Sequence, residues 1–279
     1  MIIQWYPGHM TKAKRMMQED IKLIDLVIEL VDARIPVSSR NPDIDDLAKG
    51  KSRMILLNKS DLADVKINNE WVNYFKEKGF VTLLIDSKNR VGFSDIKKAI
   101  EVACREKIER NKKRGIIGRP VRAMIVGIPN VGKSTFINSL CKKACTKTGN
   151  KPGVTKGKQW IKLDNTVELL DTPGILWPKF DNEQIGNNLA FIGSVNDEIL
   201  DISELAMELV EYVKKQYPGA LYSRYNINED EAALNIIEQI ANNRGCIKKQ
   251  NEPDYDKASR LIVDDFRSGK LGRMSLERP

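Results

Sequence analysis

The sequence predicts an α/β protein, with a mainly parallel β-sheet covered by helices on both faces and a small all-helical domain after it. Two observations support this prediction. Short apolar runs alternate with helix-length polar segments through the first part of the chain. From about residue 180 the strand signal fades, and apolar residues recur every four positions at Leu205, Leu209 and Val213. We therefore expect two domains, residues 1–178 and 179–279.

The elements are predicted in the order in which these runs occur. A helical N-terminal segment covers residues 1–23, and apolar runs predict strands at 26–31, 54–57, 81–85, 121–126, 160–163 and 167–170. The last two strands surround Asp164-Asn165 and predict a hairpin. Helices are expected at 93–112, 135–141, 228–245 and 255–268. The helix at 228 is favoured by the acidic residues Glu229 to Glu231, which suit the positive end of a helix dipole.

Composition narrows the class of protein before any motif is considered. The 279 residues are 41% apolar, enough for a sizeable core, and 46 basic against 38 acidic residues give a net charge of +8. This surplus favours a polyanion or an anionic ligand as partner. The single histidine, His9, excludes a multi-histidine metal site. Four scattered cysteines and the lack of a signal-like or membrane-spanning run predict a cytoplasmic protein with no membrane partner.

Residues 127–134 carry the strongest motif, Gly-Ile-Pro-Asn-Val-Gly-Lys-Ser, between a predicted strand and a predicted helix. This G-x-x-x-x-G-K-S spacing is typical of a P-loop, in which backbone N–H groups and a helix N-terminus surround phosphates. Lys133 would reach the β- and γ-phosphates, and the Ser134 hydroxyl would bind Mg²⁺. A turn without a ligand is the weaker interpretation. The nucleotide-binding residues expected here are Asn130, Val131, Gly132, Lys133, Ser134 and Thr135.

An acidic residue follows a later apolar strand, in Asp171-Thr-Pro-Gly174. In P-loop proteins an aspartate at this place holds Mg²⁺, so we assign Asp171 to the metal and Gly174 to the nucleotide. Between the two motifs, Thr155 could close over the metal and the γ-phosphate. A simple turn at 171–174 and a surface threonine at 155 remain the alternatives.

Asn58-Lys59-Ser60-Asp61, at the end of an apolar strand, resembles the guanine-recognition motif Asn-Lys-x-Asp of Ras-like GTPases. The resemblance implies that Asp61 accepts hydrogen bonds from guanine, that Asn58 steadies the loop, and that the Lys59 stem lies on the base. Asp86-Ser87-Lys88 resembles the next base-contact loop, usually Ser-Ala-Lys, but departs from it at Asp86 and in lacking the alanine. Taken alone, the tetrapeptide at 58–61 could also be a turn that starts a helix.

The order of these motifs is the reverse of that in ordinary Ras-like proteins, where the phosphate loop comes first. The chain therefore resembles the circularly permuted GTPases of bacterial ribosome biogenesis. Segments 5–10, 31–36 and 269–277 share this resemblance, which covers nearly the whole chain. It implies a GTPase that uses GTP/GDP and Mg²⁺ and acts late in maturation of the large (50S) ribosomal subunit. The implied partners are the precursor subunit, its rRNA and its ribosomal proteins, and we expect a monomer.

The residue that orients the attacking water is not at its usual place. Ile175 follows the Asp-x-x-Gly motif where Ras-like enzymes carry a glutamine, and an apolar side chain cannot polarise water. We therefore expect slow hydrolysis that the ribosome stimulates. The resemblance suggests His9 as the catalytic group; alternatively, His9 contacts RNA or packs on Trp5 and Tyr6. In related GTPases the residue at Asn130 binds K⁺, so K⁺ is a further expected cofactor, with a structural loop asparagine as the alternative.

Basic residues precede and follow the phosphate loop in the sequence and predict contacts with RNA phosphates. They are Arg110, Lys112, Lys113, Arg114, Arg119, Arg122, Lys142, Lys143, Lys147, Lys151, Lys156, Lys158 and Lys162. Trp160 or Tyr225 could stack on bases, and Arg267, Lys270 and Arg273 of the helical RNA-binding domain could follow an RNA backbone. A solvated charged surface is the alternative. A second functional hypothesis is a non-catalytic RNA-binding assembly factor in which GTP is a structural ligand.

Overall fold

The chain forms two compact units. The first unit contains residues 4–180 and 275–279, and the second contains residues 181–274. The sequence-based division placed 275–279 with the second part, whereas these residues pack with the first. This computed structural model describes residues 8–116, 118–141, 159–172, 174, 176, 182–249 and 251–279.

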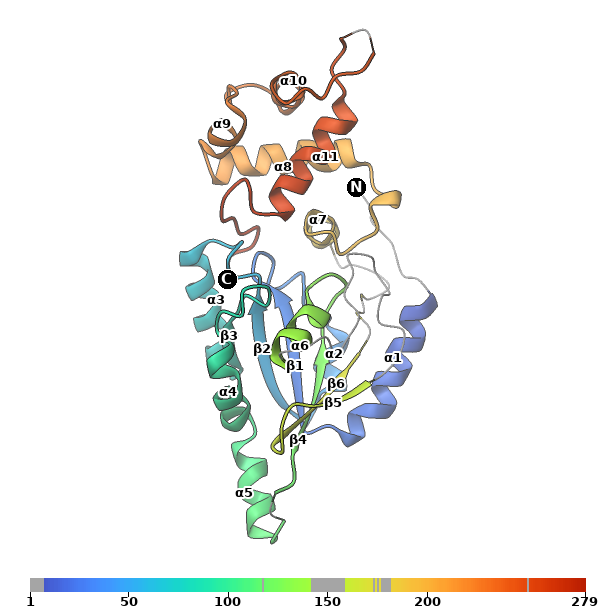
Figure 1. Cartoon of the computed structure of the whole chain (residues 1–279), viewed down its shortest axis with the longest axis vertical. Helices are drawn as coiled ribbons and strands as arrows, with labels where there is room; N and C mark the ends of the chain where they lie inside the picture. Colours follow the sequence, from blue (N-terminus) through green and yellow to red (C-terminus); the bar gives the residue numbers. More distant parts are fainter. Residues whose placement is uncertain are drawn as a thin grey trace. The chain divides into compact units, whose positions relative to one another are not determined.

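The first unit is built on one six-stranded sheet with the strand order β3-β2-β1-β4-β6-β5 (Figure 1). Every neighbouring pair is parallel except β5 and β6, which form the predicted hairpin. The mainly parallel sheet is thus confirmed, and each strand lies within two residues of its predicted bounds. The strands are β1 (Leu26–Asp32), β2 (Ser52–Asn58), β3 (Val81–Leu84), β4 (Val121–Val126), β5 (Gln159–Lys162) and β6 (Val167–Asp171).

Strand β1 joins the two halves of the sheet. On one side it pairs with β2, with Asp32 opposite Asn58, and on the other it pairs with β4, which leads into the phosphate loop. Because these strands are parallel, their carboxyl ends meet at one edge of the sheet. The loops after β1, β2, β3, β4 and β6 therefore gather at that edge, although they come from distant parts of the chain.

Helices flank this sheet, with α3 and α4 against β3 and α6 against β6 (Figure 1). The predicted helix at 93–112 is wrong as a single element, because it breaks at Cys104, which has the non-helical angles φ −103° and ψ 10°. The buried side of α4 ends there, and no residue of α5 is fully buried, although Lys107, Ile108 and Asn111 are half-buried. The helices are α1 (Gly8–Asp20), η1 (Ile21–Leu23), α2 (Asp43–Leu47), α3 (Val65–Glu77), η2 (Phe93–Asp95), α4 (Ile96–Ala103), α5 (Arg105–Lys113) and α6 (Lys133–Cys141).

The second unit is helical in its described residues, and its core lies where α8 packs on α10 and α11. One helix starts later than predicted, at Ala233 rather than Asn228. The Glu229 carboxylate accepts instead from the backbone N–H groups of Gly219 (2.6 Å) and Tyr222 (2.7 Å), at the start of the preceding helix. The elements are α7 (Glu183–Phe191), η3 (Asp197–Ile199), α8 (Ile202–Gln216), α9 (Ala220–Tyr225), α10 (Ala233–Asn243) and α11 (Tyr255–Arg267).

Across the described part of both units, no helix combines the length and the apolar character that crossing a bilayer requires.

Candidate nucleotide-binding site

The phosphate loop, residues 127–134, connects β4 to α6 as the sequence predicted. Lys133 begins α6, is 8% exposed, and turns its ammonium back into the loop. Its Nζ donates to the carbonyls of Gly127 and Ile128, each at 3.0 Å. Burial lowers the pKa of Lys133, and the nearby Asp171 carboxylate opposes that shift. A cation is thus held where bound phosphate oxygens could replace the loop carbonyls as its partners.

Gly132 in the phosphate loop and Gly174 after β6 each lie so close to neighbouring groups that a side chain would not fit. Gly132 has φ +100°, and a Cβ there would lie 2.6 Å from Nδ2 of Asn58. A Cβ on Gly174 would lie 2.9 Å from the backbone nitrogen of Pro129 and 2.8 Å from Nζ of Lys133. Because no larger residue fits at either position without displacing these groups, the glycines are required by the site itself.

The guanine-type motif lies directly against the phosphate loop. Nδ2 of Asn58 donates to the carbonyl of Val131 at 2.8 Å, and Nζ of Lys59 donates to the carbonyl of Asn130 at 2.9 Å. These partners are more than seventy positions apart in the sequence. The structure therefore brings together the two stretches that the sequence presents in swapped order. Ser60 and Asp61 follow in the same loop, between β2 and α3, and are half-buried.

The loop after β3 is tied to both stretches. The N–H and hydroxyl of Ser87 donate to Oδ1 of Asn58 at 3.1 and 2.7 Å, and the Ser87 carbonyl accepts from Ser139 of α6 at 2.7 Å. Asp86 accepts from the backbone N–H groups of Lys88 and Asn89 and from the Asn89 side chain. The departure from Ser-Ala-Lys at this position thus has a structural role, because Asp86 shapes the loop that presents Ser87.

Asp171 ends β6 and is 1% exposed. Its Oδ1 has no hydrogen-bond partner among the described residues, and burial raises the pKa of this carboxyl, opposed by Lys133. A buried carboxylate oxygen without a partner, beside a phosphate loop, suits a hard divalent cation such as Mg²⁺. Ser134 is the second residue of α6, and Thr135 follows it. Thr155, the third expected metal ligand, lies outside the described residues.

A buried ion cluster at the end of β1 was missed by the sequence reasoning. Asp32 is fully buried and accepts from Nε and Nη2 of Arg34 at 2.9 Å each, while Nζ of Lys59 lies 3.0 Å away. Burial opposes the charged form of Asp32, but the two cations outweigh it and hold the pKa of this carboxyl far below its usual value. The sequence feature that could have predicted this cluster is Asp32-Ala-Arg34, an acidic and a basic residue at the end of an apolar strand.

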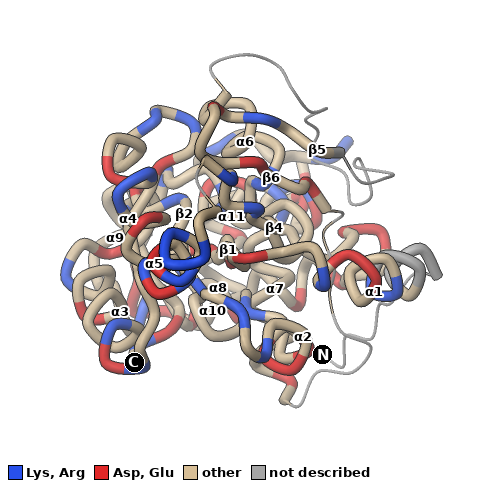
Figure 2. Tube along the Cα trace, turned by 90° about the horizontal axis from the view of Figure 1, so that it is seen from below, with Lys and Arg blue, Asp and Glu red and all other residues tan. Residues whose placement is uncertain are grey.

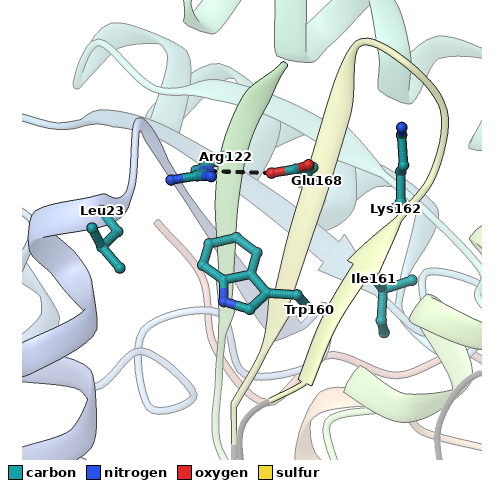
Figure 3. A pocket seen from close by; sticks show the side chains of 6 residues that line it. All are labelled: Leu23, Arg122, Trp160, Ile161, Lys162 and Glu168. Atoms are coloured by element: carbon teal, nitrogen blue, oxygen red, sulfur yellow. Dashed lines mark hydrogen bonds and ion pairs between the residues drawn. The ribbon is translucent and has the colours of Figure 1, made fainter. Parts of the chain in front are cut away.

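Other predicted residues fall outside the site or beyond what can be described. His9 lies in the first turn of α1, but its side chain is not among those described, nor are Ile175 and the lysines from 142 to 158. Trp160 is 41% exposed on β5, and the Arg122 guanidinium lies 5.4 Å from the centre of its ring (Figure 3). Arg122 also pairs with Glu168 at 3.1 Å.

Two residues expected to contact RNA, Tyr225 and Arg267, are instead engaged in the helical core or its ion pairs. Tyr225 is 2% exposed, and its hydroxyl donates to Asp265 at 3.1 Å, so its ring is not available for stacking. Arg267 donates to Asp197 and to the carbonyls of Ala190 and Phe191. Lys270 also pairs with Asp265, at 3.2 Å, but its side chain is 57% exposed, and its contact with RNA stays a prediction.

The fold and the meeting of the two motifs define a circularly permuted P-loop GTPase. A family model described as 50S ribosome-binding GTPase matches residues 122–246, from β4 onward, which leaves the motif at 58–61 outside the match. Ribosome biogenesis GTPase A of Bacillus cereus is 49% identical over 280 residues, covering 100% of this chain and 95% of that protein. The protein of the same name from Thermotoga maritima is 34% identical, with 99% and 95% covered.

Two solved structures are also similar. A GNP-bound structure of YlqF from T. maritima matches with a TM-score of 0.71 and 30% identity, covering 96% of this chain and 98% of that one. A GDP-bound structure of YlqF matches with a TM-score of 0.72 and 29% identity, covering 95% and 99%. The chain belongs to the ribosome biogenesis GTPase A family. It is a GTPase, and this replaces the hypothesis in which GTP is only a structural ligand.

Proposed function

We propose that this GTPase binds the precursor of the large ribosomal subunit and acts late in its maturation, with GTP hydrolysis gating its release. The observation that carries the proposal is the contact of Asn58 and Lys59 with the phosphate loop, in a chain that aligns over its full length with ribosome biogenesis GTPases. The test is co-sedimentation with large-subunit precursors. We expect retention with a non-hydrolysable GTP analogue and loss with GDP; equal retention in both states would contradict the gating.

In this proposal each part of the site has a separate task. Asp61 accepts from the guanine base, with Asn58, Lys59, Ser60 and the loop at Asp86-Ser87 around it. Backbone N–H groups of the phosphate loop and the Lys133 ammonium hold the phosphates. Ser134, Thr155 and Asp171 would hold Mg²⁺, which neutralises charge on the β- and γ-phosphates when bound.

His9 is proposed as the group that activates water. The position after Gly174, where a glutamine is usual, is Ile175, so the chain must supply a polar group from elsewhere. General acid–base assistance contributes roughly 10²- to 10⁴-fold. We therefore expect His9→Ala to lower ribosome-stimulated single-turnover hydrolysis by about 100-fold, with GDP affinity unchanged. Stimulated rates equal to those of the unsubstituted protein would assign His9 to another task.

Asn130 is proposed to hold K⁺ beside the phosphates. It occupies the left-handed region with φ 58°, and its carbonyl is already bound by Lys59. A cation there would take the place of an arginine finger. We expect hydrolysis in KCl to exceed that in NaCl by more than about tenfold. Asn130→Gly preserves the left-handed backbone while removing the amide, so it should abolish the difference; equal rates in both salts with the unsubstituted protein would dismiss K⁺.

The basic connector, residues 110–120 from the end of α5 to β4, is proposed to contact rRNA away from the nucleotide. It precedes the amino end of β4, whereas the phosphate loop follows the carboxyl end of this strand, roughly 20 Å further on. Helix α5 extends past the sheet at this pole, and Figure 2 shows Lys and Arg gathered on it. Residues 105–114 contain six basic and two acidic side chains. A hollow of about 610 Å³ beside α5 has five cationic and two acidic side chains in its lining: Lys51, Arg53, Lys78, Lys107, Arg110, Asp25 and Glu106.

This placement predicts which lysines control binding to the subunit. Lys112→Glu with Lys113→Glu should weaken co-sedimentation and lower the salt dependence of binding, by roughly one in the log–log slope per lost phosphate contact. The matched control reverses two exposed lysines of α3, Lys66 and Lys76, with the same change in net charge. If both double variants bind equally weakly, total charge rather than α5 is responsible. Nucleotide affinity should be unchanged in both.

A further inference from the structure

Residues 275–279, here called the return segment, lie in the first unit although they follow the helical unit in the sequence. Figure 1 places the end of the chain beside α3. Ser275 is fully buried and Leu276 is 9% exposed. The return segment is therefore packed into the nucleotide-binding unit, and the residues that it contacts indicate what it does there.

The return segment bridges the loops that follow β1 and β2. The Glu277 carboxylate accepts from the backbone N–H of Val37 (2.7 Å), from that of Ser38 (3.0 Å) and from the Ser38 hydroxyl. The N–H of Leu276 donates to the carbonyl of Arg34 at 2.8 Å. A carboxylate that accepts from two successive N–H groups fixes the course of the loop at 34–38.

On its other side the segment contacts the start of α3. The Ser275 hydroxyl accepts from the N–H of Asp64 at 3.2 Å, and the Glu277 carbonyl accepts from Nε1 of the buried Trp71 at 3.3 Å. Asp64 is the N-cap of α3, since its carboxylate accepts from the N–H groups of Lys66 and Ile67. It also closes the loop that begins at Asn58, so the base-recognition loop is held from its far end.

From Arg34 the contacts continue without a gap to the phosphate loop. The Arg34 guanidinium donates two hydrogen bonds to Asp32 and its backbone N–H donates a third, Asp32 pairs with Lys59, and Lys59 donates to the carbonyl of Asn130. Asp32 and Arg34 are 0% and 1% exposed, so the contacts between them are shielded from solvent, while the Lys59 side chain is 24% exposed. The first link lies within the loop after β1, whereas the other two join separate segments: Asp32 to Lys59 connects the ends of β1 and β2, and Lys59 to Asn130 connects the base-recognition loop to the phosphate loop.

We propose that Glu277 is a positioning residue for guanine-nucleotide binding. It anchors the loop at 34–38, and through Arg34 and Asp32 it holds Lys59 and the base-recognition loop against the phosphate loop. The inference rests on the proposed role of residues 58–61 in binding the base. It assigns to the return segment a part in retaining the nucleotide, and not in the chemical step.

The test measures release of fluorescent GDP from the full-length protein. We expect Glu277→Ala to speed release by about fivefold or more and to raise KM for GTP, with kcat at saturating GTP largely retained. Glu277→Gln, which preserves the shape and one acceptor oxygen, should restore part of the retention. Arg278→Ala, an exposed neighbour, is the matched control and should release GDP at the unsubstituted rate.

A second experiment tests whether Glu277 acts on nucleotide release through Asp32 and Lys59. Asp32→Asn should also speed release, and the Glu277→Ala, Asp32→Asn double variant should be less impaired than the product of the two effects, because both act through Lys59. If Glu277→Ala does not fold, the rate of GDP release from Glu277→Gln is compared with that of the unsubstituted protein instead. Release at the unsubstituted rate from folded Glu277 variants would overturn the inference. If the unsubstituted protein binds GDP and ADP alike, the base assignment fails instead.

Discussion

Asp61→Asn is expected to lower affinity for GDP and GTP by about 100-fold or more and to create affinity for xanthine nucleotides. A carboxylate accepts from both the N1–H and the 2-amino group of guanine, whereas an amide presents one N–H donor that opposes a guanine donor. Sites built on such hydrogen bonds reject mismatched ligands strongly, because buried polar groups are left unpaired. Xanthine carries an oxygen in place of the 2-amino group and so complements the amide.

The measurement is a titration of the purified variant with guanosine and xanthosine diphosphates. Asp61→Ala serves as control, because it removes the carboxylate without adding a donor and should lose guanosine binding without gaining xanthosine binding. An unchanged preference for guanosine in Asp61→Asn would remove Asp61 from the base site, even though Asn58 and Lys59 contact the phosphate loop.

Lys133→Ala is the second substitution with a large expected effect. It removes the ammonium that stands over the loop carbonyls of Gly127 and Ile128 and would contact the β- and γ-phosphates. Charge stabilisation by one preorganised donor is worth roughly 10²- to 10³-fold in rate. We expect single-turnover GTP hydrolysis to fall by at least about 100-fold, with weaker GTP binding. Lys98→Ala, an exposed lysine of α4, should hydrolyse GTP normally; equal loss in both variants would contradict a specific role for Lys133.

The sheet and the two nucleotide motifs were predictable because their signals are local. A P-loop needs glycines and a lysine at fixed spacing, and Asn58 to Asp61 form one continuous stretch at the end of a strand. That the two motifs would meet followed from a parallel sheet whose strand ends share one edge. The pairing of β1 with both β2 and β4 is the structural reason.

The supporting contacts were not predictable, because their partners are remote in the sequence. Glu277 and Ser38 are separated by 239 positions, and no periodicity or motif joins them. Tyr225 was predicted wrongly for a different reason: its local sequence fits two roles, because a tyrosine beside basic residues can stack on RNA or fill a core. Its hydroxyl found a buried partner in Asp265, and that contact places it in the core. The helix break at Cys104 likewise depends on where the packed face ends.

Hydrogen–deuterium exchange of the unsubstituted protein, with and without GDP, tests most directly whether one pocket is formed from both halves of the permuted chain. GDP should slow exchange at the backbone amides of 58–64 and of 130–135 together, and ADP at the same concentration should slow neither stretch to a comparable extent. Slowed exchange confined to 130–135, or identical patterns with GDP and ADP, would contradict a shared guanine-nucleotide pocket.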